Sequence, residues 1–262
     1  MYHEEIESLG FTGRLKGLRS IKRWKSFVPA FYRHDLEMHT LEILFILDDL
    51  APLIKQALPN IDMEKARVLA LVHDDPETVS KDGDVEFNKK LNMTADELEE
   101  LEHDEEEAIE KLSNIWPKED NGYNYHNILY EAKAKNTVES QLISFIDKFS
   151  ALCESLHELH AGNKGFHKGW RTERARPPVR GTNINELIPK YNLIKPFFSI
   201  QHPIIPLYKK PDVGHLLETG KPYTPESVLQ SSDLRHYDYW KSVIIKNGGS
   251  LAIKWLTEQR EF

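Results

Sequence analysis

Apolar residues recur at helical spacing through the first two thirds of the chain. Between Asp35 and Ala57 they occupy positions 36, 43, 44, 46, 47 and 50, and a longer apolar stripe runs through residues 137–161. Positions three and four residues apart lie on one face of an α-helix, so each stripe can pack against a neighbouring helix. The pattern predicts an all-α fold.

Local signals mark where further helices begin and where the chain turns. Asp62 is placed to cap a short helix that stops near Pro76. Thr94 and Glu97 form the pattern of a capping box ahead of a very acidic helix. Asn121-Gly122 predicts a turn after that helix. His73 and Asp74 therefore fall at the C-terminal end of an apolar helix.

The composition of the chain changes after Gly162. Six lysines and arginines lie between residues 164 and 180, and prolines are frequent from there to residue 206. We predict one domain over residues 1–166 and a partly irregular C-terminal extension over residues 167–262. A final helix is expected over residues 233–259. The extension could serve as a lid, in packing or in oligomerisation, so a homodimer is possible.

Charge and cysteine content exclude several classes of protein. The chain has 34 Lys and Arg against 42 Asp and Glu, a formal charge of −8, which opposes binding to long nucleic acid. No stretch is apolar enough for a membrane span, and the acidic N-terminus is unlike a secretory signal. The single cysteine, Cys153, cannot form an intramolecular disulfide. We expect a cytoplasmic protein whose partners are small molecules.

The run His73-Asp74-Asp75-Pro76-Glu77 carries the strongest chemical signal. An imidazole beside carboxylates at the end of an apolar helix is costly to bury unless something compensates the charge, and a divalent metal ion would do so. Taken alone, the run could be a solvated helix end. His39 could be a core histidine, and Asp147, which interrupts an apolar stripe, could pair with Lys148 or with an arginine on a neighbouring helix. The combination favours a metal site.

This order of residues, H…HD…D, resembles the HD-domain superfamily of metal-dependent phosphohydrolases. The resemblance is closer still to the bacterial 5′-deoxyribonucleotidases, in which an Arg-Trp pair also precedes the first histidine and an acidic pair follows the His-Asp motif. It covers roughly residues 13–166. It implies an HD-domain helical bundle with four metal ligands, which are His39, His73, Asp74 and Asp147.

The resemblance also implies an activity and a role for each further site residue. The activity is hydrolysis of a nucleoside 5′-monophosphate, a deoxyribonucleotide in particular, to nucleoside and phosphate. The cofactor is a divalent ion, such as Mn, Co, Mg, Ni or Zn. Glu77 would activate a water molecule, Arg23 would bind phosphate, Trp24 would line the sugar pocket, and Asp82 would accept a hydroxyl proton.

Two other functions and a second metal ion remain open. The basic segment over residues 164–180 could hold additional phosphates, which would favour a nucleoside triphosphate hydrolase. A non-catalytic, metal-binding regulatory protein would keep the same ligands without turnover. His103 and His126 lie between Asp74 and Asp147, where dinuclear HD enzymes carry extra ligands.

Overall fold

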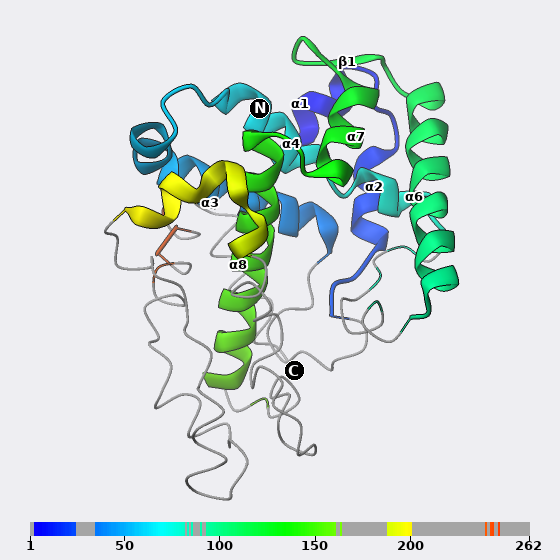
Figure 1. Ribbon diagram of the computed structural model, residues 1–262. Helices are drawn as coiled ribbons and strands as arrows, with labels where there is room; N and C mark the ends of the chain where they lie inside the picture. Colours follow the sequence, from blue (N-terminus) through cyan, green and yellow to red (C-terminus); the bar gives the residue numbers. More distant parts are fainter. Residues whose placement is uncertain are drawn as a thin grey trace, which may run out of the picture. The chain divides into compact units, whose positions relative to one another are not determined.

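The structure is a computed structural model that describes residues 3–24, 35–81, 83, 85, 90, 93–160, 163, 188–200, 239, 242, 243 and 246. It is mostly helical, which confirms the predicted all-α class (Figure 1). The elements are α1 (His3–Ser8), α2 (Arg14–Ser20), α3 (Leu36–Ala57), α4 (Met63–Val72), η1 (Asp75–Thr78), α6 (Ala95–Ile115), β1 (Glu119–Asp120), β2 (Tyr123–Asn124), α7 (Tyr125–Ala134), α8 (Val138–His160), η3 (Ile188–Lys190) and η4 (Asn192–Ser199).

The chain divides into two compact units, which we describe separately. The first draws its described residues from residues 1–26, 33–44 and 62–143, and the second from residues 27–32, 45–61 and 144–262. No helix in the described part of the chain is long and apolar enough to cross a membrane. The predicted domain boundary at residue 166 and most of the predicted helix over residues 233–259 lie outside the described residues.

In the first unit, helices α2 and α6 pack against the short 3₁₀ turn η1, and α6 and α4 both pack against α7. Gly17 makes the contact between α2 and η1 close, because a Cβ atom added there would lie 3.1 Å from the Cβ atom of Thr78. The absence of a side chain at position 17 lets α2 lie directly against this turn.

Helix α4 forms where the sequence predicts it and delivers the His-Asp pair at its end. Asp62 accepts a hydrogen bond from the backbone N–H of Lys65 at 3.1 Å, which confirms the predicted cap. The last five residues of the helix, residues 68–72, are all buried. A helix buried all round is held by its neighbours on several sides, so its C-terminal end has little freedom to move.

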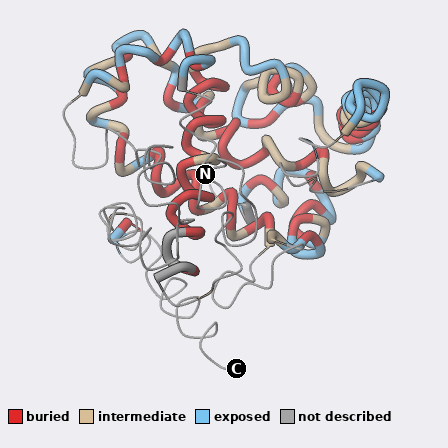
Figure 2. The backbone as a smooth tube through the Cα atoms, turned by 60° about the horizontal axis from the view of Figure 1, so that its bottom comes forward, coloured by how far each residue is buried: buried red, intermediate tan, exposed pale blue. Residues whose placement is uncertain are grey.

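Helix α6 and the hairpin after it also follow local signals. Thr94 and Glu97 form the capping box, with Glu97 N–H to Thr94 Oγ1 at 3.2 Å and Thr94 N–H to Glu97 Oε2 at 2.7 Å. Most of α6 is exposed, with its buried positions along one side (Figure 2). The predicted turn at Asn121-Gly122 is present, with φ of 50° and 82°. It joins β1 to β2, two short antiparallel strands that the sequence analysis did not predict.

The second unit has an aromatic core on helix α8. Phe145 and Phe149 stack at 6.1 Å, and Phe197 of η4 meets Phe145 edge-on at 5.8 Å. Tyr239 meets Phe149 at 6.1 Å and donates a hydrogen bond to Asp49 Oδ2 at 2.8 Å. Tyr191, Phe197, Phe198 and Tyr239 of the predicted extension therefore pack against α8.

Candidate metal centre

Three of the four predicted metal ligands come together in the first unit. His39 lies on α3, His73 caps the C-terminus of α4, and Asp74 follows it. The Nε2 atoms of His39 and His73 lie 3.7 Å and 3.3 Å from the two carboxylate oxygens of Asp74. One ligand atom from each residue lies within 4.8 Å of the others. Ligands that share a divalent ion lie roughly 3 to 4 Å apart, since each bond is about 2.0–2.2 Å long, so the cluster has the right size.

The hydrogen bonding of His73 fits a metal ligand. Its Nδ1 atom lies 3.0 Å from the carbonyl oxygen of Ala70, which can only accept, so Nδ1 carries the proton. In the neutral form of the ring, which is the form that binds a metal ion, the Nε2 atom then presents a lone pair toward Asp74. This Nε2 atom is buried and has no hydrogen-bond partner within the described residues. A ring oriented through Nδ1–H with its other nitrogen facing a carboxylate is the arrangement that metal-binding histidines adopt.

Helix α2 ties the segment that carries His39 to the rest of the site. Arg19 of α2 donates to both carboxylate oxygens of Glu37, with Nη2 to Oε1 at 2.8 Å, and Glu37 lies two residues before His39. The His39 ring is almost completely buried, as is the neighbouring Thr40. The first turn of α3 is therefore fixed next to α2.

Asp147, the fourth predicted ligand, lies on α8 in the second unit. Its carboxylate pairs with Lys148, the alternative that the sequence analysis left open. Its role as a ligand stays a prediction.

Three of the four residues predicted to bind or activate the substrate are described by the structure, and they lie near the segments that carry the metal ligands. Glu77 is in η1, half-buried, and its N–H donates to the carbonyl of Asp74 at 3.1 Å. Arg23 lies with its guanidinium carbon 5.8 Å from the ring centroid of Trp24, within the range of a cation–π contact. Lys22 bridges to Asp35 just before α3, which brings the Arg-Trp pair to the start of that helix. Asp82 lies outside the described residues.

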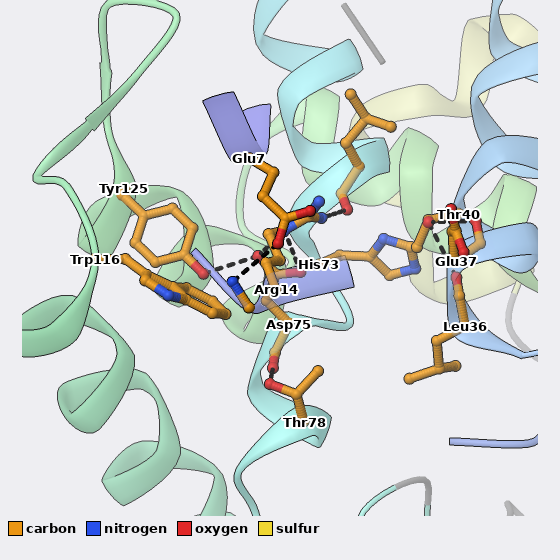
Figure 3. A network of polar contacts seen from close by, with 12 residues as sticks. Glu7, Arg14, Leu36, Glu37, Thr40, His73, Asp75, Thr78, Trp116 and Tyr125 are labelled. Carbon is orange, nitrogen blue, oxygen red and sulfur yellow. Dashed lines mark hydrogen bonds and ion pairs between the residues drawn. The ribbon is translucent and has the colours of Figure 1, made fainter. Parts of the chain in front are cut away.

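The sequence analysis missed a buried network that surrounds Asp75. Arg14 Nε lies 2.9 Å and 2.8 Å from the two carboxylate oxygens of Asp75, and Arg14 Nη2 donates to the carbonyl of Leu71. The Tyr125 hydroxyl donates to Asp75 Oδ2 at 2.8 Å. In Figure 3 the His73 ring projects from this network toward the part of α3 that carries Glu37. The sequence does show Asp75 as a further acidic residue between Asp74 and Glu77, but its partners Arg14 and Tyr125 are far from it in the sequence.

Burial sets the protonation of this network. Burial by itself would lower the pKa of Arg14, but attraction to the Asp75 carboxylate raises it above its usual value. Burial and then the Asp75 charge raise the pKa of Tyr125 well above its usual value. Both groups therefore remain protonated at neutral pH and donate to Asp75.

Asp120, on β1, is a second buried carboxylate near Arg14. Burial raises its pKa to about 6, against the attraction of Arg14, and the charge of Asp75 raises it further. Within the described part of the chain, neither of its oxygens has a hydrogen-bond partner. A carboxylate in such surroundings takes up a proton more readily than one in water.

His103 and His126, the candidates for a second metal site, form surface pairs instead. His103 Nε2 lies 3.3 Å from Glu107, and His126 Nε2 lies 2.8 Å from Glu110. Among the described residues, neither belongs to a group of three ligand side chains close enough to share an ion.

Comparison with known proteins shows which family and which solved structures the chain is similar to. A family model described as 5′-deoxynucleotidase YfbR-like matches residues 10–179. No curated protein matches the chain. A solved structure from Pyrococcus horikoshii OT3 is similar with a TM-score of 0.51 at 16% identity, covering 84% of this chain and 98% of that one, which supports the fold.

Two further solved structures are similar to the chain at lower scores. A conserved hypothetical protein from Pyrococcus furiosus has a TM-score of 0.49 at 18% identity, covering 71% of this chain and 90% of its own. A predicted metal-dependent phosphohydrolase from Magnetospirillum magnetotacticum MS-1 has a TM-score of 0.49 at 15% identity, covering 94% of this chain and 90% of its own.

Proposed function

The chain belongs to the 5′-deoxynucleotidase YfbR-like family, and on that premise we propose that it hydrolyses deoxyribonucleoside 5′-monophosphates to nucleoside and phosphate. Membership makes it a metal-dependent phosphohydrolase with a nucleotide substrate. The preference for the deoxy sugar and the role of each residue are the proposal. A cytosolic location and a homodimer also stay predictions.

The observation that carries the proposal is the cluster of His39, His73 and Asp74, whose ligand atoms lie within 4.8 Å of one another. Two imidazole nitrogens and a carboxylate oxygen suit a divalent transition-metal ion and leave positions for substrate oxygens. We assign Asp147 as the fourth ligand, as the family resemblance implies. When bound, the ion would supply Lewis-acid activation of water and neutralise charge on the phosphate.

The remaining roles are assigned to residues near the two ligand segments. Glu77 follows Asp74 in η1, and its carboxylate would take a proton from the attacking water. The Arg23 guanidinium would bind two phosphate oxygens in a bidentate fork. Trp24 would line the sugar, and its φ of 57°, rare for a bulky residue, supports a constrained position at the site. Asp82 would accept a hydrogen bond from a sugar hydroxyl.

A substrate panel tests the proposal. Deoxy- and ribonucleoside mono-, di- and triphosphates are incubated with the full chain and Mn²⁺, Co²⁺, Mg²⁺ or Ni²⁺, and free phosphate and nucleoside are both measured. We expect equal amounts of nucleoside and phosphate from deoxyribonucleoside monophosphates. Preferential release of triphosphate or pyrophosphate from triphosphates would favour the triphosphohydrolase. Metal binding without turnover on any nucleotide would favour the regulatory protein.

A further inference from the structure

The guanidinium of Arg14 forms hydrogen bonds with the chain just before and just after the His73–Asp74 pair. Its Nη2 atom donates to the carbonyl of Leu71, two residues before His73, and its Nε atom binds the carboxylate of Asp75, directly after Asp74. We propose that Arg14 and Tyr125 are positioning residues, which act through Asp75 to set the geometry of the metal ligands. This inference rests on the metal site proposed above.

The first contact holds the end of helix α4. Leu71 belongs to the last turn of α4, where backbone carbonyls have no partner within the helix. A cation at this end is favoured by the helix dipole. Arg14 therefore stops the last turn from unwinding and fixes the direction in which His73, the next residue but one, leaves the helix.

The second contact holds the residue after the ligands. The Asp75 carboxylate accepts from Arg14 at 2.9 Å and 2.8 Å and from Tyr125 at 2.8 Å, and its backbone carbonyl accepts from Thr78 Oγ1 at 2.7 Å. With Leu71 and Asp75 both held by one rigid, planar group, the two residues between them that carry the ligand atoms have few backbone conformations left.

A contribution to stability does not account for this network. Arg14 and Asp75 are completely buried, and removing two charges from water offsets most of what their attraction returns, so apolar residues of similar size often serve a core as well. A buried ion pair does give one defined geometry. The ion pair surrounds the ligands His73 and Asp74, so it can orient them, and apolar side chains of similar size could not.

Tyr125 supplies a further hydrogen-bond donor to Asp75. Its ring meets Phe11 edge-on at 5.0 Å and Trp116 at 6.1 Å, so the ring is fixed before its hydroxyl contributes anything. Removing only the hydroxyl would keep this packing while Asp75 loses one of its donors. The helix that begins at Tyr125 would then no longer restrain the motif.

The chain offers a matched control two residues away. Tyr123 also donates its hydroxyl to an aspartate at 2.8 Å, but the acceptor is Asp62 at the N-terminus of α4, at the other end of that helix from the ligands. Tyr123→Phe and Tyr125→Phe therefore each remove one phenol–carboxylate hydrogen bond. They differ in whether the carboxylate adjoins a metal ligand.

The experiment compares Mn²⁺ affinity in the full chain by isothermal titration calorimetry, with the thermal midpoint of the metal-free proteins measured alongside. We expect Tyr125→Phe to weaken Mn²⁺ binding about tenfold, the lower end of what loss of a group supporting a ligand costs. Tyr123→Phe should change it less than twofold. Arg14→Lys, which keeps the charge but not the fork, should weaken binding more than Tyr125→Phe does.

The outcomes separate the two proposals. Equal affinities for wild type, Tyr123→Phe and Tyr125→Phe would overturn the positioning role while leaving the metal site intact. Loss of affinity in both tyrosine variants, in step with their thermal midpoints, would mean a general effect of stability and would also overturn it. A wild-type chain that binds neither Mn²⁺ nor Co²⁺ would overturn the metal site on which the inference rests.

Discussion

Histidines and carboxylates meet in two parts of the first unit, with opposite surroundings. Around the turn after α4, buried His39 and largely buried His73 face Asp74, and buried Arg14 and Tyr125 hold the next residue. At the surface of α6, His103 of the same helix pairs with Glu107, and His126 of α7 pairs with Glu110. The residue types are the same. The difference lies in how many fixed groups surround each pair.

This difference decides what each region can bind. A surface ion pair is screened by solvent and contributes little, because both side chains have other conformations and water to interact with. His39 is buried and the side chains of His73 and Asp74 are only 12% and 14% exposed, so these groups have little water to bind, and a metal ion is a favourable partner when their positions are already fixed. In the sequence, the two regions differ as candidate metal sites only in their motifs. In the structure, they differ in how far the histidines and carboxylates are buried.

Asp74→Asn should have the largest effect, because it removes the carboxylate that faces both histidines. We expect metal content and activity to be lost together, measured by elemental analysis of the purified protein and by phosphate release. Glu110→Gln on α6 serves as the surface control and should keep both. An Asp74→Asn variant with stoichiometric metal and normal turnover would show that the site is wrong.

Glu77→Ala should separate chemistry from metal binding. The side chain lies one turn after the ligands in η1 and is not in the ligand cluster. We expect the metal to stay and kcat to fall by roughly 10² to 10⁴, as for loss of a general base. Steady-state kinetics and metal content are measured on the same preparation. An unchanged kcat with a raised KM would assign Glu77 to binding instead.

Asp120→Asn tests the comparison through pH, because the pKa of a buried carboxylate and that of a surface carboxylate are shifted in opposite directions. Burial raises the pKa of Asp120 to about 6, whereas the hydrogen bond from His126 lowers the pKa of Glu110. Asp120 binds its proton more tightly when folded than when unfolded. Its contribution to the free energy of unfolding is therefore present near pH 4 and lost as pH rises toward 6.

Removing this carboxylate should stabilise the protein at pH 7.5 by about 1–2 kcal/mol and change its stability little near pH 4. Urea unfolding of wild type and variant at both pH values measures the effect. A difference in the free energy of unfolding between variant and wild type that is the same at both pH values would contradict the raised pKa.

His103→Ala and His126→Ala should have the smallest effect. Each removes one partner of a surface pair, within α6 for His103 and between α7 and α6 for His126, and such pairs contribute little to folding or to a site elsewhere. We expect Mn²⁺ stoichiometry and kcat/KM within twofold of wild type. Loss of half the bound metal in either variant would reinstate the second ion that the spacing of these histidines suggested.

The features that sequence predicts here are those that depend on neighbours along the chain. The caps at Asp62 and Thr94 and the turn at Asn121-Gly122 join residues that are close in sequence, so their chemistry can be read from a short window. The grouping of His39 with His73 followed from family resemblance, because no window includes both.

The network around Asp75 could not be predicted in that way. Arg14 lies 61 residues from Asp75, and Tyr125 lies 50 residues from it. An arginine in the short helix α2 or a tyrosine at the start of α7 gives no local sign that it will be buried against an aspartate. The tertiary fold, with α2 against η1 and α7 against α4, brings the three groups together.

The contact between α2 and η1 limits how this protein can be improved. Alanine in place of Gly17 is an obvious choice for an engineer, because it favours a helix by about 1 kcal/mol. The added methyl would lie 3.1 Å from the Cβ atom of Thr78, whose hydroxyl is bonded to the backbone of Asp75. Any gain in thermostability would therefore come with a shift of the turn that carries Glu77, a trade of catalytic rate for robustness.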